Sequence, residues 1–494
     1  MFESAELGHK VSKEQYKKDS PRLRQELLTK QFELINGKSF SVLILIAGIE
    51  GAGKGETVNL LNEWLDPRHI QTHGFLMPRP DELERPGMSR YWEALPAKGK
   101  IGVFLGNWYT EPITRRVLGE ISKVELDRAV TDIVRLERML AAEDVLLVKF
   151  WFHLSKAQQK RRLQALERDP DRRGWVKKQD WEAFRLYDRF RAVAQHALRL
   201  TDRGEAPWTV VEGADAEYRN LTVANTLLAA LADRLARKER AETCVPDTTP
   251  PLPRPVDDRN VLTSLDYGRK LPRSRYDREK DRWQARLRAL TLKPKFARRS
   301  VVLVFEGFDA AGKGGGIRRV TQAVDARIYK VVPIQAPTDE EAARPYLWRF
   351  WRHLPRRGRI TIFDRSWYGR VMVERIEGFC SERDWMRAYS EINDFEHQLV
   401  EHGVVVVKFF LAITKDEQLR RFREREQTPF KRFKITAEDW RNRKKWTRYG
   451  HAVCDMVDRT STDAAPWTLV EANDKLFARV KVLRTVCEAI ERAL

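Results

Sequence analysis

Two glycine–lysine loops in this chain have the residue types that bind phosphate. The first reads GIEGAGKG at residues 48–55 and the second reads GFDAAGKG at residues 307–314, so they begin 259 residues apart. Glycines let backbone N–H groups turn inward around phosphate oxygens, a following helix adds its positive N-terminal dipole, and the lysine neutralises charge. Because each loop follows an apolar run typical of a buried strand, the sequence predicts two phosphate-binding loops.

Only the second loop is followed by an acidic residue where phosphate chemistry needs one. The stretch FDRSWY, residues 363–368, aligns with FLGNWY, residues 104–109, at the same offset. An acid at the end of a neighbouring strand commonly binds metal in phosphate-loop enzymes, and an arginine beside it presents a planar fork to phosphate. The first copy has Leu105 in place of Asp364 and Gly106 in place of Arg365. We predict one competent site and one impaired copy, with a strand-end cap as the alternative role of Asp364.

The second loop also contains an acid, Asp309, where a carboxylate is costly unless it binds metal or accepts a proton. We interpret it as a metal ligand or as the base that prepares an acceptor oxygen. The usual Ser/Thr after the loop lysine is missing, so Mg²⁺ must rely on carboxylates, Asp309 and Asp364, and on phosphate oxygens. The predicted phosphate ligands of this loop are Gly307, Gly312, Lys313, Gly314 and Gly315. The impaired loop keeps Glu50, Gly53 and Lys54.

A basic run follows the third apolar strand of the second copy. Residues 420–434 read RRFREREQTPFKRFK, with seven Lys/Arg against two Glu. A solvated helix face is the ordinary interpretation of such a run. The alternative is a mobile lid, which must place cations over the transferring phosphates because catalysis is mainly positioning and charge neutralisation. The run contains Arg421, Arg425, Lys431 and Lys434, and the first copy has Leu166 and Trp175 in place of Arg425 and Lys434.

The same offset continues to the end of the chain and indicates a tandem duplication. APWTVVEG at residues 206–213 matches APWTLVEA at residues 465–472. Between the copies, residues 244–258 contain five prolines, which favour an extended linker. We therefore predict an N-terminal kinase-like domain, a linker and a C-terminal catalytic domain. Their bounds are 1–243, 244–259 and 260–494.

Each copy has the alternating pattern of an α/β domain. Val301–Phe305 is a continuous β-branched and apolar run, typical of a strand buried on both faces, and the glycine loop follows it directly. Apolar residues between 385 and 399 recur at helical spacing. We predict a parallel sheet sandwiched by helices, with ligands at the carboxyl ends of the strands.

Composition narrows the class of protein. The hydrophobic fraction is 42%, the four cysteines have no CxxC spacing, and the N-terminus has no apolar signal core, which fits a cytoplasmic protein without a membrane partner. The net charge of +21 has three explanations: a solvated surface, a nucleic-acid partner or another polyanion. The absence of a helix-turn-helix, zinc-finger or RNA-recognition signature favours the polyanion over nucleic acid.

Several stretches together resemble the second family of polyphosphate kinases. These are GFDAAGKGG, FDRSWYGR, ERIEGFC, the basic lid and APWTLVEAND. The resemblance covers nearly the whole chain, twice. It implies a thymidylate-kinase-like fold and Mg²⁺-dependent phosphoryl transfer between inorganic polyphosphate and nucleotides, with AMP converted to ADP by fused two-domain members. It assigns the chemistry to Asp309, Lys313, Asp364 and Arg365, and it places the predicted lid cations among Arg421, Arg425, Lys431 and Lys434. It leaves activity of the first copy in doubt.

The resemblance implies direct in-line transfer from polyphosphate to AMP without a covalent enzyme intermediate. Alternatives are an ATP-dependent nucleoside monophosphate kinase, a polyphosphate:ADP phosphotransferase making ATP, and a nucleic-acid-binding ATPase. The first copy could be a structural or regulatory module that still binds phosphate. Self-association stays open, because no stretch reads as an oligomer seam.

Overall fold

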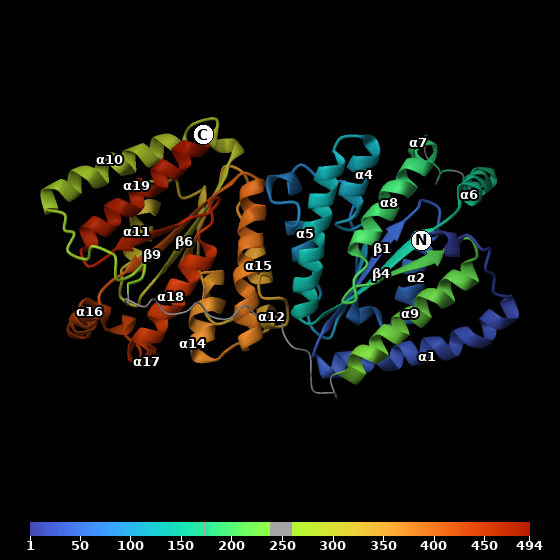
Figure 1. The fold of residues 1–494 in the computed structure, drawn as a ribbon, viewed down its shortest axis with the longest axis horizontal. Helices are drawn as coiled ribbons and strands as arrows, with labels where there is room; N and C mark the ends of the chain where they lie inside the picture. Colours follow the sequence, from blue (N-terminus) through green and yellow to red (C-terminus); the bar gives the residue numbers. More distant parts are fainter. Residues whose placement is uncertain (172–173, 175, 177, 238–258) are drawn as a thin grey trace. The chain divides into compact units, whose positions relative to one another are not determined.

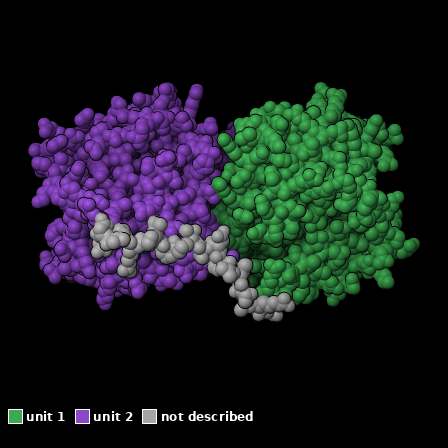
Figure 2. Space-filling model, viewed as in Figure 1, with its two compact units in different colours: residues 1–79, 90–243, 337–348 green, residues 80–89, 244–336, 349–494 purple. Residues whose placement is uncertain are grey.

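The computed structural model describes residues 1–171, 174, 176, 178–237 and 259–494 of the chain. It divides into two compact units (Figure 2). Unit 1 comprises residues 1–79, 90–243 and 337–348, and unit 2 comprises residues 80–89, 244–336 and 349–494. Two short segments thus group with the unit other than the one that their place in the sequence suggests. The predicted linker, except Arg259, lies outside the described residues, so the domain bounds stay a prediction.

Residues 1–237 form one five-stranded parallel sheet flanked by helices (Figure 1). Its strand order is β2-β3-β1-β4-β5. The strands are β1 (Ser41–Gly48), β2 (Ile70–Gly74), β3 (Ile101–Leu105), β4 (Val145–His153) and β5 (Trp208–Glu212). The helices are α1 (Lys13–Gly37), α2 (Lys54–Trp64), α3 (Ser89–Glu93), α4 (Thr110–Leu118), α5 (Lys123–Ala142), α6 (Lys156–Arg168), α7 (Lys178–Arg185), α8 (Tyr187–Thr201) and α9 (Ala216–Arg237).

The second half of the chain repeats this arrangement, with strand order β7-β8-β6-β9-β10. The strands are β6 (Ser300–Gly307), β7 (Tyr329–Pro333), β8 (Ile360–Asp364), β9 (Val404–Ala412) and β10 (Trp467–Glu471). The helices are α10 (Arg273–Thr291), α11 (Lys313–Thr321), α12 (Asp339–Ala342), α13 (Trp348–Trp351), α14 (Arg375–Glu377), α15 (Glu382–Glu401), α16 (Lys415–Gln427), α17 (Ala437–Lys444), α18 (Trp446–Thr460) and α19 (Lys475–Ala493). A π-helical turn, η7 (Arg370–Glu374), precedes α14, and a 3₁₀ turn, η8 (Pro429–Lys434), follows α16.

These sheets confirm the predicted α/β class with two tandem parallel sheets. In unit 2 the central strand β6 pairs with β8 on one side and β9 on the other, so Val301 faces both Ile360 and Val405. Helices α15 and α18 cover one face of this sheet, and α10, α11 and α19 cover the other (Figure 1). Because both faces are covered, β6 is buried along nearly all its length, which its apolar, β-branched sequence permits. No helix among the described residues is both long enough and apolar enough to span a membrane.

A buried polar cluster explains why both copies keep the Trp-Tyr pair after the strand-end position. The Lys408 Nζ donates to Glu396 Oε2 at 2.7 Å and to the Tyr368 hydroxyl at 2.8 Å. The same Glu396 accepts from Trp367 Nε1 at 3.0 Å. Unit 1 repeats the cluster with Lys149, Glu137, Tyr109 and Trp108. A buried charge must be paired, so each copy keeps the whole set to hold the turn after its strand.

Candidate active site

The glycine loop of unit 2 connects β6 to α11 with a backbone that larger residues would obstruct. Gly307 has φ +148°, and a Cβ there would lie 2.5 Å from the carbonyl oxygen of Leu411. Gly312 has φ +109° and caps the N-terminus of α11, which begins at Lys313. The Lys313 Nζ folds back to donate to the carbonyl oxygen of Gly307 at 2.7 Å. The lysine ammonium therefore lies directly over the cradle of the loop.

A cleft of about 730 Å³ opens over this loop. Its lining includes the glycine loop and α11, the strand-end residues Asp364 and Arg365, the end of β7, the lid region and the start of α19. The four residues predicted to carry the chemistry therefore share one cavity. Burial and the nearby Arg365 guanidinium both lower the pKa of Lys313. Gly312, Gly314 and Gly315 also line the cleft, and Gly307 lies at the mouth of a neighbouring cavity.

Asp309 is held between the strand end and the lid. Its Oδ1 lies 3.5 Å from the Arg365 guanidinium, and its Oδ2 accepts from Asn442 Nδ2 at 3.0 Å. The side chain is only 15% exposed. Asn442 belongs to α17 and has no counterpart amide in the first copy, where Ala183 stands at that offset. The Asp309 carboxylate is thus oriented by the Arg365 guanidinium and the Asn442 amide. The sequence analysis did not identify Asn442.

Arg365 has a strained backbone. Its φ of +82° lies in the left-handed region, which costs a non-glycine residue roughly 1–2 kcal/mol. The counterpart Gly106 has the same kind of conformation, φ +73°, without that cost. Such strain at a cleft-lining residue is typical of sites where the side chain is needed for function.

The carboxylates of this cleft fit Mg²⁺ and not a metal held by a dedicated protein cage. Asp309 and Asp364 both line it, and Mg²⁺ ordinarily uses one or two carboxylates together with substrate phosphates and water. No group of three or more His, Cys, Asp or Glu side chains suited to a metal was found among the described residues. The donor set is therefore that of a metal that arrives with its phosphate ligands.

Arg421, a predicted phosphate ligand, lines the cleft, but its guanidinium is already bound by the protein. Its side chain is 2% exposed, and all five of its N–H groups are directed at protein oxygens. The acceptors are Glu417 Oε1 at 2.6 Å and the carbonyl oxygens of Ala310 and Ala311 at 2.9 Å, Ala472 at 2.6 Å and Asn473 at 2.9 Å. Arg421 therefore connects the loop to the segment that follows β10 and holds the loop in shape.

Of the other three predicted lid cations, the structure describes the side chain of one. Arg425, on α16, lines the cleft. The side chains of Lys431 and Lys434 lie outside the described residues. Their backbone forms η8, directly before α17. The predicted lid is therefore helical on both sides of a short 3₁₀ turn, as α16, η8 and α17.

Four cations of the cleft were missed by the sequence analysis. They are Arg318 and Arg319 on α11 and Lys475 and Arg479 at the start of α19. The offset of 259 places Asn59, Leu60, Ala216 and Asn220 at these positions of the first copy. A full comparison of the two copies would have found them, because every one of these charges is lost together with Asp364 and Arg365. They extend the basic wall of the cleft away from the glycine loop.

A second, apolar cavity adjoins the cleft. Phe308 and Trp446 stack there, with ring centroids 4.4 Å apart and planes at 20°, next to Met372 and Val453. The two cavities share a wall, made by Asp309, Arg365, Glu438 and Asn442. The polar chemistry of the cleft thus borders directly on a surface suited to a flat, apolar group.

Glu306, the residue before the loop, is buried at the end of β6. Its Oε1 accepts from the Ser366 hydroxyl at 2.8 Å. Burial raises the pKa of Glu306 to about 7, against the opposing effect of Lys313. The first copy has Ala47 at this position. Glu306 therefore adds a titratable group behind the second loop that the sequence analysis did not identify.

The loop of unit 1 has the same backbone but is filled by its own side chains. Lys54 Nζ donates to the carbonyl oxygen of Gly48 at 2.8 Å and to Glu50 Oε1 at 2.7 Å. A Cβ on Gly53 would lie 1.9 Å from the Arg219 guanidinium, which packs over the loop. Arg219 and Arg162 both bind the Glu56 carboxylate, at 2.8 Å and 2.7 Å. In unit 2 the positions of Glu56 and Arg219 are Gly315 and Ala478, and both line the cleft.

Comparisons with known proteins agree with this duplicated site. A family model described as Polyphosphate kinase 2 (PPK2) matches residues 10–239 and 270–494. A Pseudomonas aeruginosa (strain PAO1) protein named polyphosphate:AMP phosphotransferase is 58% identical over 493 residues, covering 100% of this chain and 99% of that protein. A protein of the same name from Acinetobacter johnsonii is 38% identical over 482 residues, covering 95% and 96%. A crystal structure described as polyphosphate kinase 2 from Pseudomonas aeruginosa PA01 has a TM-score of 0.89 and 55% sequence identity, over 100% of this chain and 99% of that chain. The chain therefore belongs to the polyphosphate kinase 2 family.

Proposed function

We propose that this protein transfers the terminal phosphoryl group of inorganic polyphosphate to AMP, giving ADP, and that unit 2 carries the reaction. The observation that carries the proposal is the wall shared by the two cavities of unit 2. A basic cleft suits a linear polyanion, an adjoining apolar cavity suits a nucleoside, and Asp309 and Arg365 stand between them. The full-length relatives that bear the name polyphosphate:AMP phosphotransferase support the choice of substrates.

In this proposal the donor phosphates lie over the glycine loop, and the AMP phosphate approaches from the side of the apolar cavity. Lys313 and Arg365 neutralise charge on the equatorial oxygens of the transferring group, and Asp309 orients or deprotonates the attacking oxygen. Mg²⁺, held by Asp309 and Asp364, would supply a Lewis acid that neutralises charge on the phosphates. Arg425 with the cations of α11 and α19 holds the remaining polyphosphate.

The test is an assay of AMP with polyphosphate and Mg²⁺ in the absence of ATP. ADP formation is expected from the wild type, and a loss of at least about 10²-fold is expected from Asp364→Asn. A protein that forms ADP only when ATP is supplied would be a nucleoside monophosphate kinase. A protein that phosphorylates ADP and not AMP would be a polyphosphate:ADP phosphotransferase. Near wild-type turnover by Asp364→Asn would overturn the metal assignment.

We further propose a cytoplasmic location and partners limited to polyphosphate and adenine nucleotides, without nucleic acid. The three described cysteines, Cys380, Cys454 and Cys487, are free thiols, which suits a reducing compartment. The basic residues that the site uses lie inside a cleft with a glycine loop, and this position favours a phosphate chain over a duplex. Competition by duplex DNA or RNA for polyphosphate binding would contradict this choice.

A further inference from the structure

A buried carboxylate, Glu377, connects the core of unit 2 to the lid. It ends α14, and its side chain is only 6% exposed. Its Oε2 accepts from Lys445 Nζ at 2.8 Å and lies 3.4 Å from Arg441 Nε. Both cations belong to the end of the lid, since Arg441 is on α17 and Lys445 directly follows it. One carboxylate oxygen therefore binds two lid cations.

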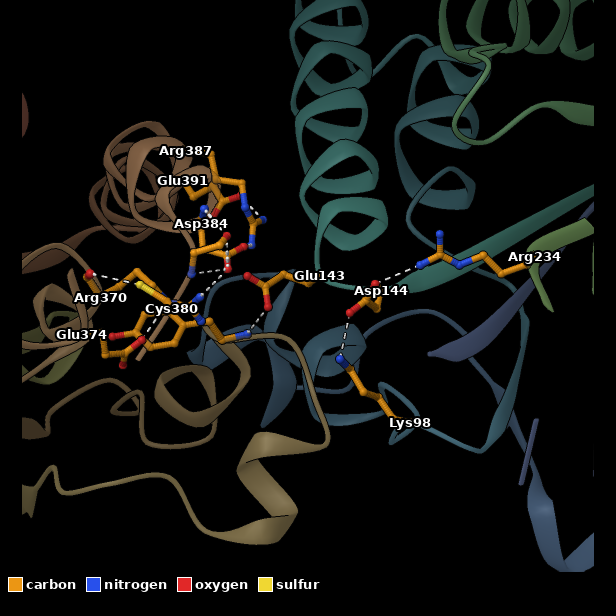
Figure 3. A network of polar contacts seen from close by, with 12 residues as sticks. Lys98, Glu143, Asp144, Arg234, Arg370, Glu374, Cys380, Asp384, Arg387 and Glu391 are labelled. Atoms are coloured by element: carbon orange, nitrogen blue, oxygen red, sulfur yellow. Dashed lines mark hydrogen bonds and ion pairs between the residues drawn. The ribbon is translucent and has the colours of Figure 1, made fainter. Parts of the chain in front are cut away.

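The core side of this contact is firmly anchored. The π-helical turn η7 leads into α14, and its Arg370 pairs with Glu374 at 3.1 Å and with Asp384, at the start of α15, at 4.0 Å (Figure 3). The Cys380 thiol lies near the Arg370 carbonyl oxygen at 3.8 Å. These contacts hold both ends of the short segment that contains Glu377 against the start of the long helix α15.

The lid side of the contact leads to the reacting centre. Asn442, next to Arg441 and one turn before Lys445, donates to Asp309 Oδ2 at 3.0 Å. The Tyr449 hydroxyl, 3.4 Å from Asn442 Oδ1, completes the set of contacts. Arg441 and Lys445 thus flank Asn442, the residue of α17 that donates to the loop carboxylate. Holding these two cations sets the position of α17 and with it the direction of the Asn442 amide.

Two observations distinguish this contact from an ordinary surface ion pair. First, Glu377 is largely removed from water, and its Oε1 has no hydrogen-bond partner among the described residues, so the lid cations are what compensate its charge. Second, the first copy has lost the whole set together. It has Leu118, Glu182, Ala183 and Leu186 where unit 2 has Glu377, Arg441, Asn442 and Lys445.

We propose that Glu377 is a positioning residue, which latches the lid helix α17 through Arg441 and Lys445 so that Asn442 binds the Asp309 carboxylate. The latch needs no substrate and therefore exists in the free protein. Its consequence for turnover rests on the function proposed above for unit 2. The two parts are tested by different measurements.

The structural test is hydrogen exchange of the free full-length protein. In Glu377→Leu, which introduces the residue of the first copy, amides of residues 437–445 should exchange at least about tenfold faster, while those of α15 stay protected. The matched control is Lys481→Met, which removes a pair of similar burial, Lys481–Glu471 at 2.7 Å, between α19 and β10 and without a residue of α17. It should leave exchange of residues 437–445 unchanged. Unchanged exchange of these residues in Glu377→Leu would overturn the proposal.

The functional test is the AMP and polyphosphate assay of the same variants. Glu377→Leu should lower kcat about ten- to a hundredfold with little change in KM for polyphosphate, because the cations of the cleft are untouched. The reversed pair, Glu377→Lys with Lys445→Glu, should regain part of the protection and part of kcat. An equal loss of kcat in Lys481→Met would assign the effect to general destabilisation and overturn the proposal.

The proposal can still be tested if Glu377→Leu does not fold or if the wild type is inactive in this assay. If Glu377→Leu does not fold, Glu377→Gln keeps the shape and removes only the charge, and the same changes in exchange and kcat are expected. If the wild type makes no ADP from AMP and polyphosphate, the proposed function fails, while exchange of residues 437–445 still decides the latch.

Discussion

The two glycine–lysine loops have nearly the same backbone and opposite surroundings. Lys54 and Lys313 donate the same hydrogen bond, to the carbonyl oxygens of Gly48 at 2.8 Å and Gly307 at 2.7 Å. Over the second loop lies a cleft of about 730 Å³, whereas over the first lies the Arg219 guanidinium, paired with Glu56. The glycines and the lysine therefore preserve the form of a phosphate cradle, and the side chains around them decide whether phosphate has room.

A second comparison separates what the fold needs from what the chemistry needs. The buried cluster of lysine, glutamate, tyrosine and tryptophan is complete in both units. Asp364, Arg365, Asn442 and the cations of α11 and α19 are present only in unit 2. Unit 1 folds without Asp364, Arg365, Asn442 and these cations. We therefore infer that they serve the reaction in unit 2, whereas the buried cluster stabilises the sheet in both units.

The largest expected effect comes from Arg365→Gly, which gives the second copy the residue of the first. Loss of the guanidinium should lower kcat by about 10³-fold or more. Relief of the left-handed backbone, φ +82°, should at the same time raise the free energy of unfolding by about 0.5–1 kcal/mol. The measurements are steady-state kinetics and urea unfolding of the same preparation.

The control for Arg365→Gly is a change at the matching position of unit 1, Gly106. A Cβ at Gly106 would lie 2.3 Å from the carbonyl oxygen of Phe75, so Gly106→Ala should destabilise the protein by about 1–3 kcal/mol. Its kcat should be unchanged. A variant Arg365→Gly that is both less stable and fully active would contradict the interpretation of Arg365 as a strained functional residue.

The loop lysines give the next effect. Lys313→Ala should lower kcat by about 10²–10³-fold, because a cation aimed at the transferring phosphate is removed. Lys54→Ala should stay within about twofold of the wild type, because Lys54 is already bound to Glu50 and the Arg219 guanidinium packs over its loop. Single-turnover rates measure both. Similar losses in the two variants would mean that both units catalyse the transfer.

Many of the strands, helices and site residues were predictable from the sequence. The residues that the sequence analysis missed were missed for physical reasons. Strands such as Val301–Phe305 and the helix around Trp385 were found because burial imposes a period that one chain displays. The five hydrogen bonds of Arg421 to protein oxygens could not be foreseen, because a basic run does not reveal which side chain of α16 turns inward. Glu306 was overlooked because a single acid in an apolar strand gains its meaning only from Ser366 and Lys313, which are distant in sequence.

Glu306 should make the stability of unit 2 depend on pH in a way that unit 1, with Ala47, cannot. Its pKa of about 7 in the folded protein lies above the ordinary value of 4.5, so the folded state holds this proton more tightly than the unfolded state. The resulting stability is fully present below pH 4.5 and is lost as pH rises through 7, by about 3 kcal/mol in total. Burial causes the shift, and Lys313, Arg365 and Asp364 are the charged groups around it.

The variant Glu306→Gln isolates this effect because glutamine keeps an acceptor for the Ser366 hydroxyl and cannot ionise. Its free energy of unfolding should be close to that of the wild type near pH 5 and should exceed it by about 2–3 kcal/mol at pH 8. Urea unfolding at both pH values gives the difference. A difference that does not change with pH would mean that the carboxyl titrates equally in both states.

The smallest expected effect tests whether the first cradle is closed only by its own side chains. The double variant Glu56→Gly with Arg219→Ala gives unit 1 the residues that line the cleft of unit 2, and it removes Arg219 from above Gly53. In a Lys313→Ala background, binding of inorganic tripolyphosphate should tighten by about tenfold, because Lys54 and the N-terminus of α2 become accessible to the anion. Calorimetric titration measures the gain, and Arg219→Ala alone is the control, since the Glu56 carboxylate then stays beside the loop, bound to Arg162, and repels the anion. The rate of ADP formation should not recover, because Leu105 and Gly106 still occupy the strand end.

A gain in binding without a gain in rate would show that the first loop can bind phosphate but cannot transfer it. No gain in binding would show that the first loop has lost more than its space.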